Sequence, residues 1–445
     1  MAGLESSQRQ DWEEEGTVLH LEPSHACARI KKQEAPEKMG RLLLVSLAAV
    51  LALIPIESSA AALTPVEELG KKLFFDTNLS SPPGQACAGC HDPVNGWTGP
   101  TENPGGVYEG AVKGRFGERK PPSSAYAGDS PVLHLEKQGN FAGGLFWDGR
   151  ATGGAEWKDP LAEQAGVPFL NPLEQNNPDK KAVVLKVKGS DYARLFEQVW
   201  KLQAADWDRN VDKVYEDIAR SIAAYERSDE VNPFDSKFDA FWRKANAKDL
   251  KVEAIDATHS KEYANLGLDE SELKGLLLFN TKARCAECHT LAPGPGNKPP
   301  VFTDYTYDNT GVPKNPANPF YSMDSQFNPE GRNWLDPGLG GFLNTVPEYA
   351  PNATRNVGKY KVPTLRNVDL RRDPAFVKIY MHNGAFKSLE EVVHFYNARD
   401  GGQYPPSELK ANLNTEQLGN LRLTDEEENA LVAFLKTLSD HYKGN

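Results

Sequence analysis

The chain has 445 residues and a net charge of −12, with 50 Lys and Arg against 62 Asp and Glu. At roughly 150 residues per domain, this length is enough for two or three globular units with their own cores. With 39% hydrophobic and 25% charged residues, the composition excludes a multi-span membrane protein and a generally disordered chain. Because the charge is negative and Lys and Arg form no long run, we expect no nucleic acid partner.

An export signal is the first recognisable segment. Residues 42–56 are almost all aliphatic, basic residues precede them, and the small residues 58–62 follow. This order is typical of a secretory signal peptide, and the apolar stretch is shorter than the about 20 residues of a membrane span. We predict that residues 1–62 are an N-terminal extension and signal peptide, with translation starting at Met39. The mature protein is then periplasmic and has no membrane span; the alternatives are an uncleaved anchor and a cytoplasmic tail formed by residues 1–38.

Four of the five cysteines belong to two copies of the pattern Cys-x-x-Cys-His, and Cys27 lies before the export signal. The copies are Cys87, Cys90 and His91, and Cys285, Cys288 and His289. Cysteines three residues apart on a helical turn can form thioethers with both vinyl groups of one haem, and the adjacent histidine then becomes an iron ligand. We predict two covalently bound haem c groups, with zinc or a redox dithiol as the alternative.

A repeated pattern precedes each haem motif. Its members are Gly70, Leu73 and Phe74, and Gly275, Leu278 and Phe279. The repeat indicates two cytochrome c-like haem domains, which we place at 63–232 and 233–445, after a helical pattern over 211–225. Because strand-like alternation is rare and the connections are rich in Pro, Gly and Asn, the predicted fold class is mainly α with long loops.

The sixth iron ligand decides whether a haem transfers electrons or binds oxygen species. Residues 92–133 contain neither His nor Met, and after the signal the chain has only two methionines, Met323 and Met381. The first haem is therefore predicted to keep an open face, with the distant His134 as the alternative ligand.

Several segments, in order along the chain, resemble bacterial di-haem cytochrome c peroxidases and their MauG-type relatives. They are 146–151, 163–168, 171–174, 362–367, 380–384 and 389–393. The resemblance runs from about residue 63 to 438. In that family the N-terminal haem reacts with hydrogen peroxide, and the C-terminal haem relays or stores oxidising equivalents.

The resemblance implies roles for three residues near the first haem. Gln164 and Glu174 would line its distal pocket, and Trp147 would bridge the two haems. A carboxylate suits peroxide cleavage, because a proton must leave one peroxide oxygen and reach the other. A solvated surface position for Glu174 and a core position for Trp147 are the structural alternatives.

At the second haem the resemblance is closer to MauG than to classical peroxidases. The position fourteen residues after His382, a methionine in classical peroxidases, is Tyr396 here. Tyr396 is therefore the predicted sixth ligand, and Met381, His382 and His394 are the competing ones.

Two further departures concern the first haem and calcium. The loop after the first motif lacks the removable histidine of classical peroxidases, so the first haem should react without prior reduction. The family's calcium site is altered, because Lys120 follows Arg119 and Val377–Ile379 replaces a Thr-x-Pro sequence. We predict that calcium is absent and that the Lys120 ammonium occupies its space.

The predicted function is that of a peroxidase that reduces hydrogen peroxide at the N-terminal haem and draws electrons through the C-terminal haem. Its partner is a small electron-donor protein, either a cytochrome c or a cupredoxin. The alternatives are MauG-type oxidation of side chains of a partner protein, and a non-enzymatic di-haem electron-transfer cytochrome.

Overall fold

The computed structural model describes residues 62–443 except 100–102, 104 and 155. Contacts divide the chain into Met1–Glu57 and Ser58–Asn445, and every described residue belongs to the second unit. The predicted export signal and the Met39 start lie outside the described residues. Within the described part, no helix is both long enough and apolar enough to cross a membrane.

Helices joined by long loops dominate the described residues, which confirms the predicted fold class. The α-helices are α1 Pro65–Phe75, α2 Pro160–Leu170, α3 Lys180–Lys188, α4 Ala193–Trp200, α5 Asp206–Arg209, α6 Val211–Glu226, α7 Lys237–Asn246, α8 Glu270–Asn280, α9 Gly338–Thr345, α10 Leu389–Ala398 and α11 Asp425–Lys436. The strands form two antiparallel pairs, β1 His134–Leu135 with β2 Phe141–Ala142, and β3 Tyr307–Asp308 with β4 Tyr360–Lys361.

The sequence repeat corresponds to a repeated helix crossing. Helix α1 packs on α6, and α8 packs on α11. A β-carbon on Gly70 would lie 1.9 Å from the Ser221 carbonyl oxygen, and one on Gly275 would lie 2.0 Å from that of Ala430. Only glycine permits this close approach of two helix backbones. The repeat therefore encodes how each haem-motif segment is anchored to a later helix.

Sequence signals also fix where these helices begin. Helices α1, α8 and α11 each start with a capping box, in which the N-cap side chain and an acidic side chain three residues later satisfy exposed backbone N–H groups. The pairs are Thr64 with Glu67, Asp269 with Glu272, and Thr424 with Glu427.

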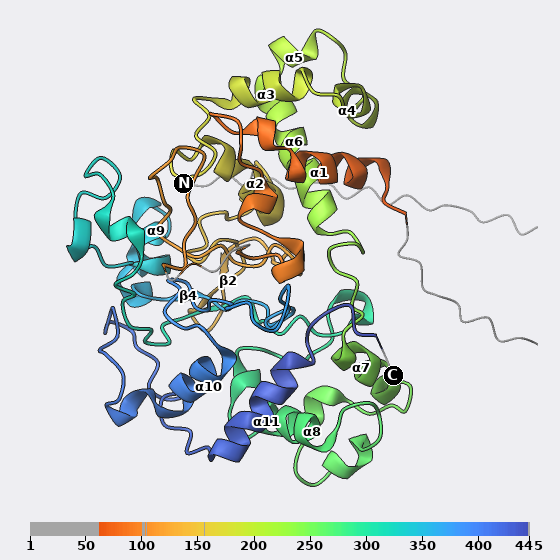
Figure 1. Ribbon diagram of the computed structural model, residues 1–445, viewed down its shortest axis with the longest axis vertical. Helices are drawn as coiled ribbons and strands as arrows, with labels where there is room; N and C mark the ends of the chain where they lie inside the picture. The colour runs from red at the N-terminus through yellow and green to blue at the C-terminus, as the bar shows by residue number, and fades with distance from the viewer. Residues whose placement is uncertain (1–61, 100–102, 104, 155, 444–445) are drawn as a thin grey trace, which may run out of the picture. The chain divides into compact units, whose positions relative to one another are not determined.

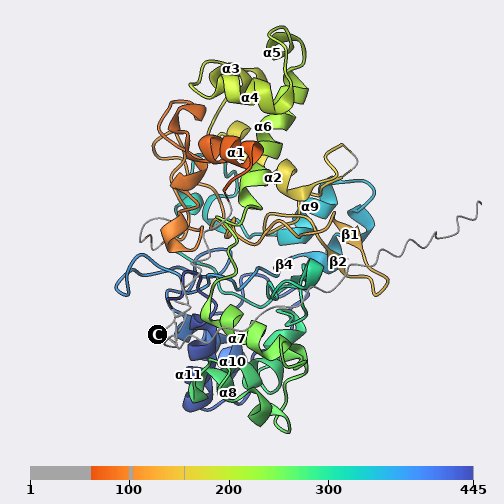
Figure 2. The same ribbon diagram turned by 90° about the vertical axis from the view of Figure 1, so that its right-hand side faces the viewer.

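Two large hydrophobic cores lie in the described residues. One gathers residues of α1 to α6, and the other gathers residues of α7, α8, α10 and α11. Figures 1 and 2 show these two groups of helices with the short strands β2 and β4 between them. The first core also contains Val301, far beyond the predicted junction at 232/233. The domain boundary itself stays a prediction.

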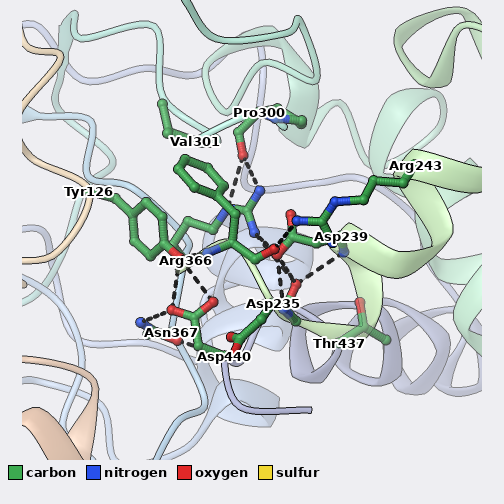
Figure 3. A network of polar contacts seen from close by, with 12 residues as sticks. Tyr126, Asp235, Asp239, Arg243, Pro300, Val301, Arg366, Asn367, Thr437 and Asp440 are labelled. Carbon is green, nitrogen blue, oxygen red and sulfur yellow. Dashed lines mark hydrogen bonds and ion pairs between the residues drawn. The ribbon is translucent and has the colours of Figure 1, made fainter. Parts of the chain in front are cut away.

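A buried polar network joins segments from both halves of the chain (Figure 3). The Arg366 guanidinium is 2.7 Å from a carboxylate oxygen of Asp239, and both side chains are inaccessible to solvent. Arg366 also donates twice to the Pro300 carbonyl, at 2.7 and 2.9 Å. Nearby, Asp440 accepts hydrogen bonds from Tyr126 and Asn367. The network connects the chain near the first haem motif with the C-terminal segment.

Replacing Arg366 tests the importance of this network. We expect Arg366→Met to lower the free energy of unfolding by about 3–5 kcal/mol, because Asp239 would remain as a buried charge without its cation. Denaturant unfolding followed by circular dichroism measures the change. The control is Arg372→Met, which removes an ion pair between an exposed Arg372 and Asp92 and should change stability by at most about 1 kcal/mol. Equal losses in the two variants would contradict a stabilising role for the buried pair.

Candidate functional site

Each Cys-x-x-Cys-His motif lies on the wall of a cavity. The first cavity is lined by Cys87, Cys90 and His91. The second is lined by Cys285, Cys288 and His289. In both motifs a tight turn joins the histidine amide to the carbonyl of the first cysteine, at 2.9 and 2.8 Å. This turn presents two thiols and one imidazole to the same space.

Both motif histidines are held as metal ligands require. The Nδ1 atom of His91 is 3.3 Å from the Trp97 carbonyl oxygen, and that of His289 is 2.9 Å from the Phe302 carbonyl oxygen. A carbonyl accepts only an N–H, so each ring carries its proton on Nδ1 and keeps the Nε2 lone pair for a metal. Burial lowers the pKa of His91 to about 4 and also lowers that of His289, which keeps both rings neutral.

The four motif cysteines are not joined by disulfides. Burial raises the pKa of Cys90, Cys285 and Cys288 to about 12, so these thiols are protonated at neutral pH. Dithiol exchange, which requires a thiolate, is therefore disfavoured there. Among the described residues, no group of three or more His, Cys, Asp or Glu could hold a metal ion. The thiols thus fit thioether formation better than either alternative.

The structure brings Gln164, Glu174 and Trp147 together at the first cavity. Gln164 lies on α2, while Glu174 follows that helix in a loop. The Oε2 atom of Glu174 is buried and has no hydrogen-bond partner. Burial raises the pKa of Glu174 to about 7, although the nearby Arg150 opposes the shift. Glu174 is therefore poised to exchange a proton near neutral pH.

Other polar residues of the first cavity were not predicted from the sequence. The side-chain oxygens of Gln85, Gln175 and Glu226 are buried there without partners. Burial raises the pKa of Glu226 to about 8. The only sequence signal for Glu226 is its position one helical turn after Ile222 on the apolar face of α6, which also lines the cavity.

Trp147, Lys120 and Pro122 line both cavities and so form a shared wall. The Trp147 indole donates to the Lys120 carbonyl at 2.7 Å, and the Trp147 carbonyl accepts from the Lys361 amide at 2.9 Å. The Trp147 ring is 6.3 Å, between centroids, from the ring of His382. The Lys120 ammonium donates to the Thr98 hydroxyl and the Pro121 carbonyl. That it replaces calcium stays a prediction.

The candidate ligands of the second haem separate into two groups. Tyr396 on α10, Met381 and His382 all line the second cavity. His394 does not line that cavity. It is half exposed, and its Nδ1 atom is 3.0 Å from a carboxylate oxygen of Glu428. Burial raises the pKa of Tyr396, so its phenolate form requires a bound cation. At the first haem, the alternative ligand His134 lies on the exposed strand β1, outside the cavity lining.

The residues of both cavities fit a c-type haem. Each cavity combines two protonated thiols, a neutral imidazole with a free Nε2 and a largely apolar lining. The unpartnered oxygens of the first cavity and the unpartnered Nε2 of His382 in the second are left to bind water or a group held in the cavity.

Known proteins resemble this chain over most of its length. Residues 65–247 match the family described as di-haem cytochrome c peroxidase. The methylamine utilization protein MauG of Paracoccus denitrificans is 31% identical, over 90% of this chain and 96% of the relative. The cytochrome-c peroxidase IdrP2 of Pseudomonas sp. (strain SCT) is 29% identical, over 88% of this chain and 85% of the relative.

A solved structure agrees with these relatives. The diheme peroxidase BthA from Burkholderia thailandensis superposes with a TM-score of 0.66 and 28% identity, covering 85% of this chain and 87% of that one. Together with the sequence relatives, it supports two haem groups rather than zinc or a dithiol.

Replacing the cysteines of one motif tests the assignment of one haem to each cavity. We expect the double substitution Cys87→Ala and Cys90→Ala to reduce covalently bound haem from two groups per chain to one. The matched substitution Cys285→Ala and Cys288→Ala should do the same, because each pair attaches its own haem. The pyridine haemochrome of the denatured protein measures the content. Two covalent haems in either variant would contradict the assignment.

Proposed function

The chain belongs to the family of di-haem cytochrome c peroxidases and MauG, and from this we propose that hydrogen peroxide reacts in its first cavity. As a member of this family, the protein is a peroxidase with two c-type haems. The observation that carries the proposal is the buried Oε2 atom of Glu174, which has no partner and lies in the cavity that His91 and Gln164 also line.

Glu174 supplies the proton transfer in this proposal. Peroxide takes up two electrons and two protons as its O–O bond breaks and two waters form. A haem held by His91 and the thioethers of Cys87 and Cys90 supplies the redox chemistry. Glu174 accepts a proton from one peroxide oxygen and returns it to the other. Its pKa near 7 makes both steps accessible at neutral pH.

Neighbouring side chains position the peroxide and tune Glu174. Gln164 lines the same cavity and offers an amide that can donate to one peroxide oxygen and accept from the other. The positive charge of Arg150 lowers the pKa of Glu174, and the negative charge of Glu118 raises it. These opposing charges leave burial as the dominant influence on the carboxyl.

Electrons reach the first cavity through the second haem and Trp147 in this proposal, because Trp147 lines both cavities. Tyr396 would be the sixth ligand of the second haem. An anionic phenolate favours oxidised iron, whereas a thioether favours reduced iron. The position of Tyr396 therefore favours a MauG-like use of the oxidising equivalents on side chains of a partner protein. The second candidate is a small electron donor, a cytochrome c or a cupredoxin, and the acidic chain would suit a basic one.

The proposed location is the periplasm. It rests on the predicted signal peptide and on the attachment of haem through Cys-x-x-Cys-His motifs.

Glu174→Gln tests the proton transfer. We expect the reaction of the fully oxidised protein with peroxide to slow by about 10²–10⁴-fold, since the amide cannot accept the proton. Stopped-flow haem absorption measures the rate. In the unmodified protein the rate should rise with pH and level off above about 7, because the carboxylate is the form that accepts the first proton. This rise should vanish in Glu174→Gln.

Glu262→Gln is the matched control, because Glu262 is exposed and lies outside the first cavity. It should keep both the rate and the pH profile. An unchanged rate in Glu174→Gln would rule out Glu174 as the proton carrier.

Tyr396→Met tests the ligand of the second haem. We expect its midpoint potential to rise, because a thioether replaces an anionic oxygen. Spectroelectrochemistry measures the potential of each haem. Met381→Leu should leave that potential unchanged if Tyr396 is the ligand. The reverse pattern, with an effect only in Met381→Leu, would assign the ligand to Met381.

A further inference from the structure

Three lysines without acidic partners, one buried and two half-buried, line the second cavity. Lys120, Lys361 and Lys378 all line it. Among the described residues, the ion pairs within 4.0 Å involve other cations, such as Arg119, Arg366 and Arg372, and none involves these three ammonium groups. The nearest acidic influence on Lys361 is the more distant Asp304.

The arginines of the same cavity are different. Arg366 is paired with Asp239, and Arg284 is paired with Glu287 at 2.6 Å. The positive charge that lacks a counter-charge in this cavity is therefore carried by the lysines. Asp308 is the one acidic residue among the described residues that line it.

Hydrogen bonding separates the three lysines further. An ammonium carries three N–H donors. Lys378 uses all three, on the carbonyls of Asn95, Asn367 and Leu370 at 2.7–3.0 Å. It is thereby satisfied by the protein.

Lys120 and Lys361 are not satisfied in this way. Lys120 has two acceptors, the Thr98 hydroxyl at 2.7 Å and the Pro121 carbonyl at 3.1 Å. Lys361 has two distant carbonyls, at 3.3 and 3.4 Å, which are weak acceptors at that length, and its ammonium lies over the rings of Tyr305 and Tyr307 at 5.2 and 5.5 Å from their centroids. Neither lysine therefore has three strong hydrogen-bond acceptors in the protein.

Burying such cations alone is unfavourable. Burial lowers the pKa of Lys120 to about 8 and that of Lys361 to about 7. A buried cation is stabilised when an anion enters with it and forms a charge-assisted hydrogen bond. A haem carries two propionate carboxylates, and these are the anions that it would bring into the cavity.

We propose that Lys361 and Lys120 bind haem propionates. Lys361 binds a propionate of the second haem. Lys120, which lies at the wall shared by both cavities, binds a propionate of one of the two haems. The inference rests on the proposed placement of one haem in each cavity. Because the Lys120 carbonyl accepts from the Trp147 indole and the Lys361 amide donates to the Trp147 carbonyl, these contacts hold the backbones of both lysines beside Trp147. Both lysines act as cofactor-binding residues that set haem position and potential.

Lys361→Met in the haem-loaded protein is the main test. Removing a nearby cation destabilises the more negative, reduced haem, so the midpoint potential of the second haem should fall. Lys361→Arg, which keeps the charge, should stay close to the unmodified protein. The matched control is Lys359→Met, which removes a half-buried lysine two residues away that does not line the cavity, and its shift should be smaller.

Infrared difference spectra of oxidised and reduced protein give a second readout. Haem labelled with ¹³C at its propionate carboxyls distinguishes these groups from Asp, Glu and free anions. The labelled band should shift in Lys361→Met and in Lys120→Met. In Lys120→Met, the haem whose potential falls identifies the propionate that Lys120 binds.

Unchanged potentials and unchanged labelled bands in both methionine variants would overturn the proposal, as would an equal fall in Lys361→Arg and Lys361→Met. The haem content of each variant is measured alongside. If a lysine variant keeps two covalent haems per chain and its potentials do not change, propionate binding is refuted. The placement of the haems is tested separately, because a single haem in either double-cysteine variant would still support it.

Discussion

The fixed position of Trp147 is the constraint on which both sites depend. Its indole is bonded to the Lys120 carbonyl and its own carbonyl to the Lys361 amide, so segments far apart in sequence hold it from two sides. Because Trp147 lines both cavities, any displacement of this residue would alter two cofactor sites together. The polar network around Arg366 joins residues of both halves of the chain, and Arg366 lines the second cavity as Trp147 does.

Local sequence predicted the parts of the structure that local chemistry determines. The Cys-x-x-Cys-His motifs form the expected tight turns, and the helix predicted over 211–225 is α6. The repeat around Gly70 and Gly275 was recognised as a repeat, although its physical reason appeared only in the structure. Each glycine lies where a second helix backbone leaves no space for a β-carbon.

The remaining features depend on contacts between distant segments, which no spacing rule reveals. In the sequence, Glu226 resembles a solvent-exposed charged residue near the end of a helix, but in the structure it is buried in the first cavity. Lys361 belongs to a two-residue strand, and its side chain is a cavity residue only because β4 pairs with β3. Helix periodicity places His394 and Tyr396, two residues apart on α10, on different faces, but only the structure shows that the face of Tyr396 lines the second cavity.

The two cavities differ in their titratable side chains, and this difference matches the proposed roles of the two haems in peroxide reduction and electron transfer. The first holds the carboxyls of Glu174 and Glu226, each with one buried oxygen that lacks a partner, and their raised pKa values keep protons available near neutral pH. The second holds Lys361 and Lys378, neither of which has a carboxylate partner, and Tyr396, while Lys120 lines both cavities. Peroxide reduction consumes protons and electrons in equal number, but protons must be delivered where the O–O bond breaks. Proton-carrying groups are therefore needed at the first haem, whereas the charges at the second act on its potential.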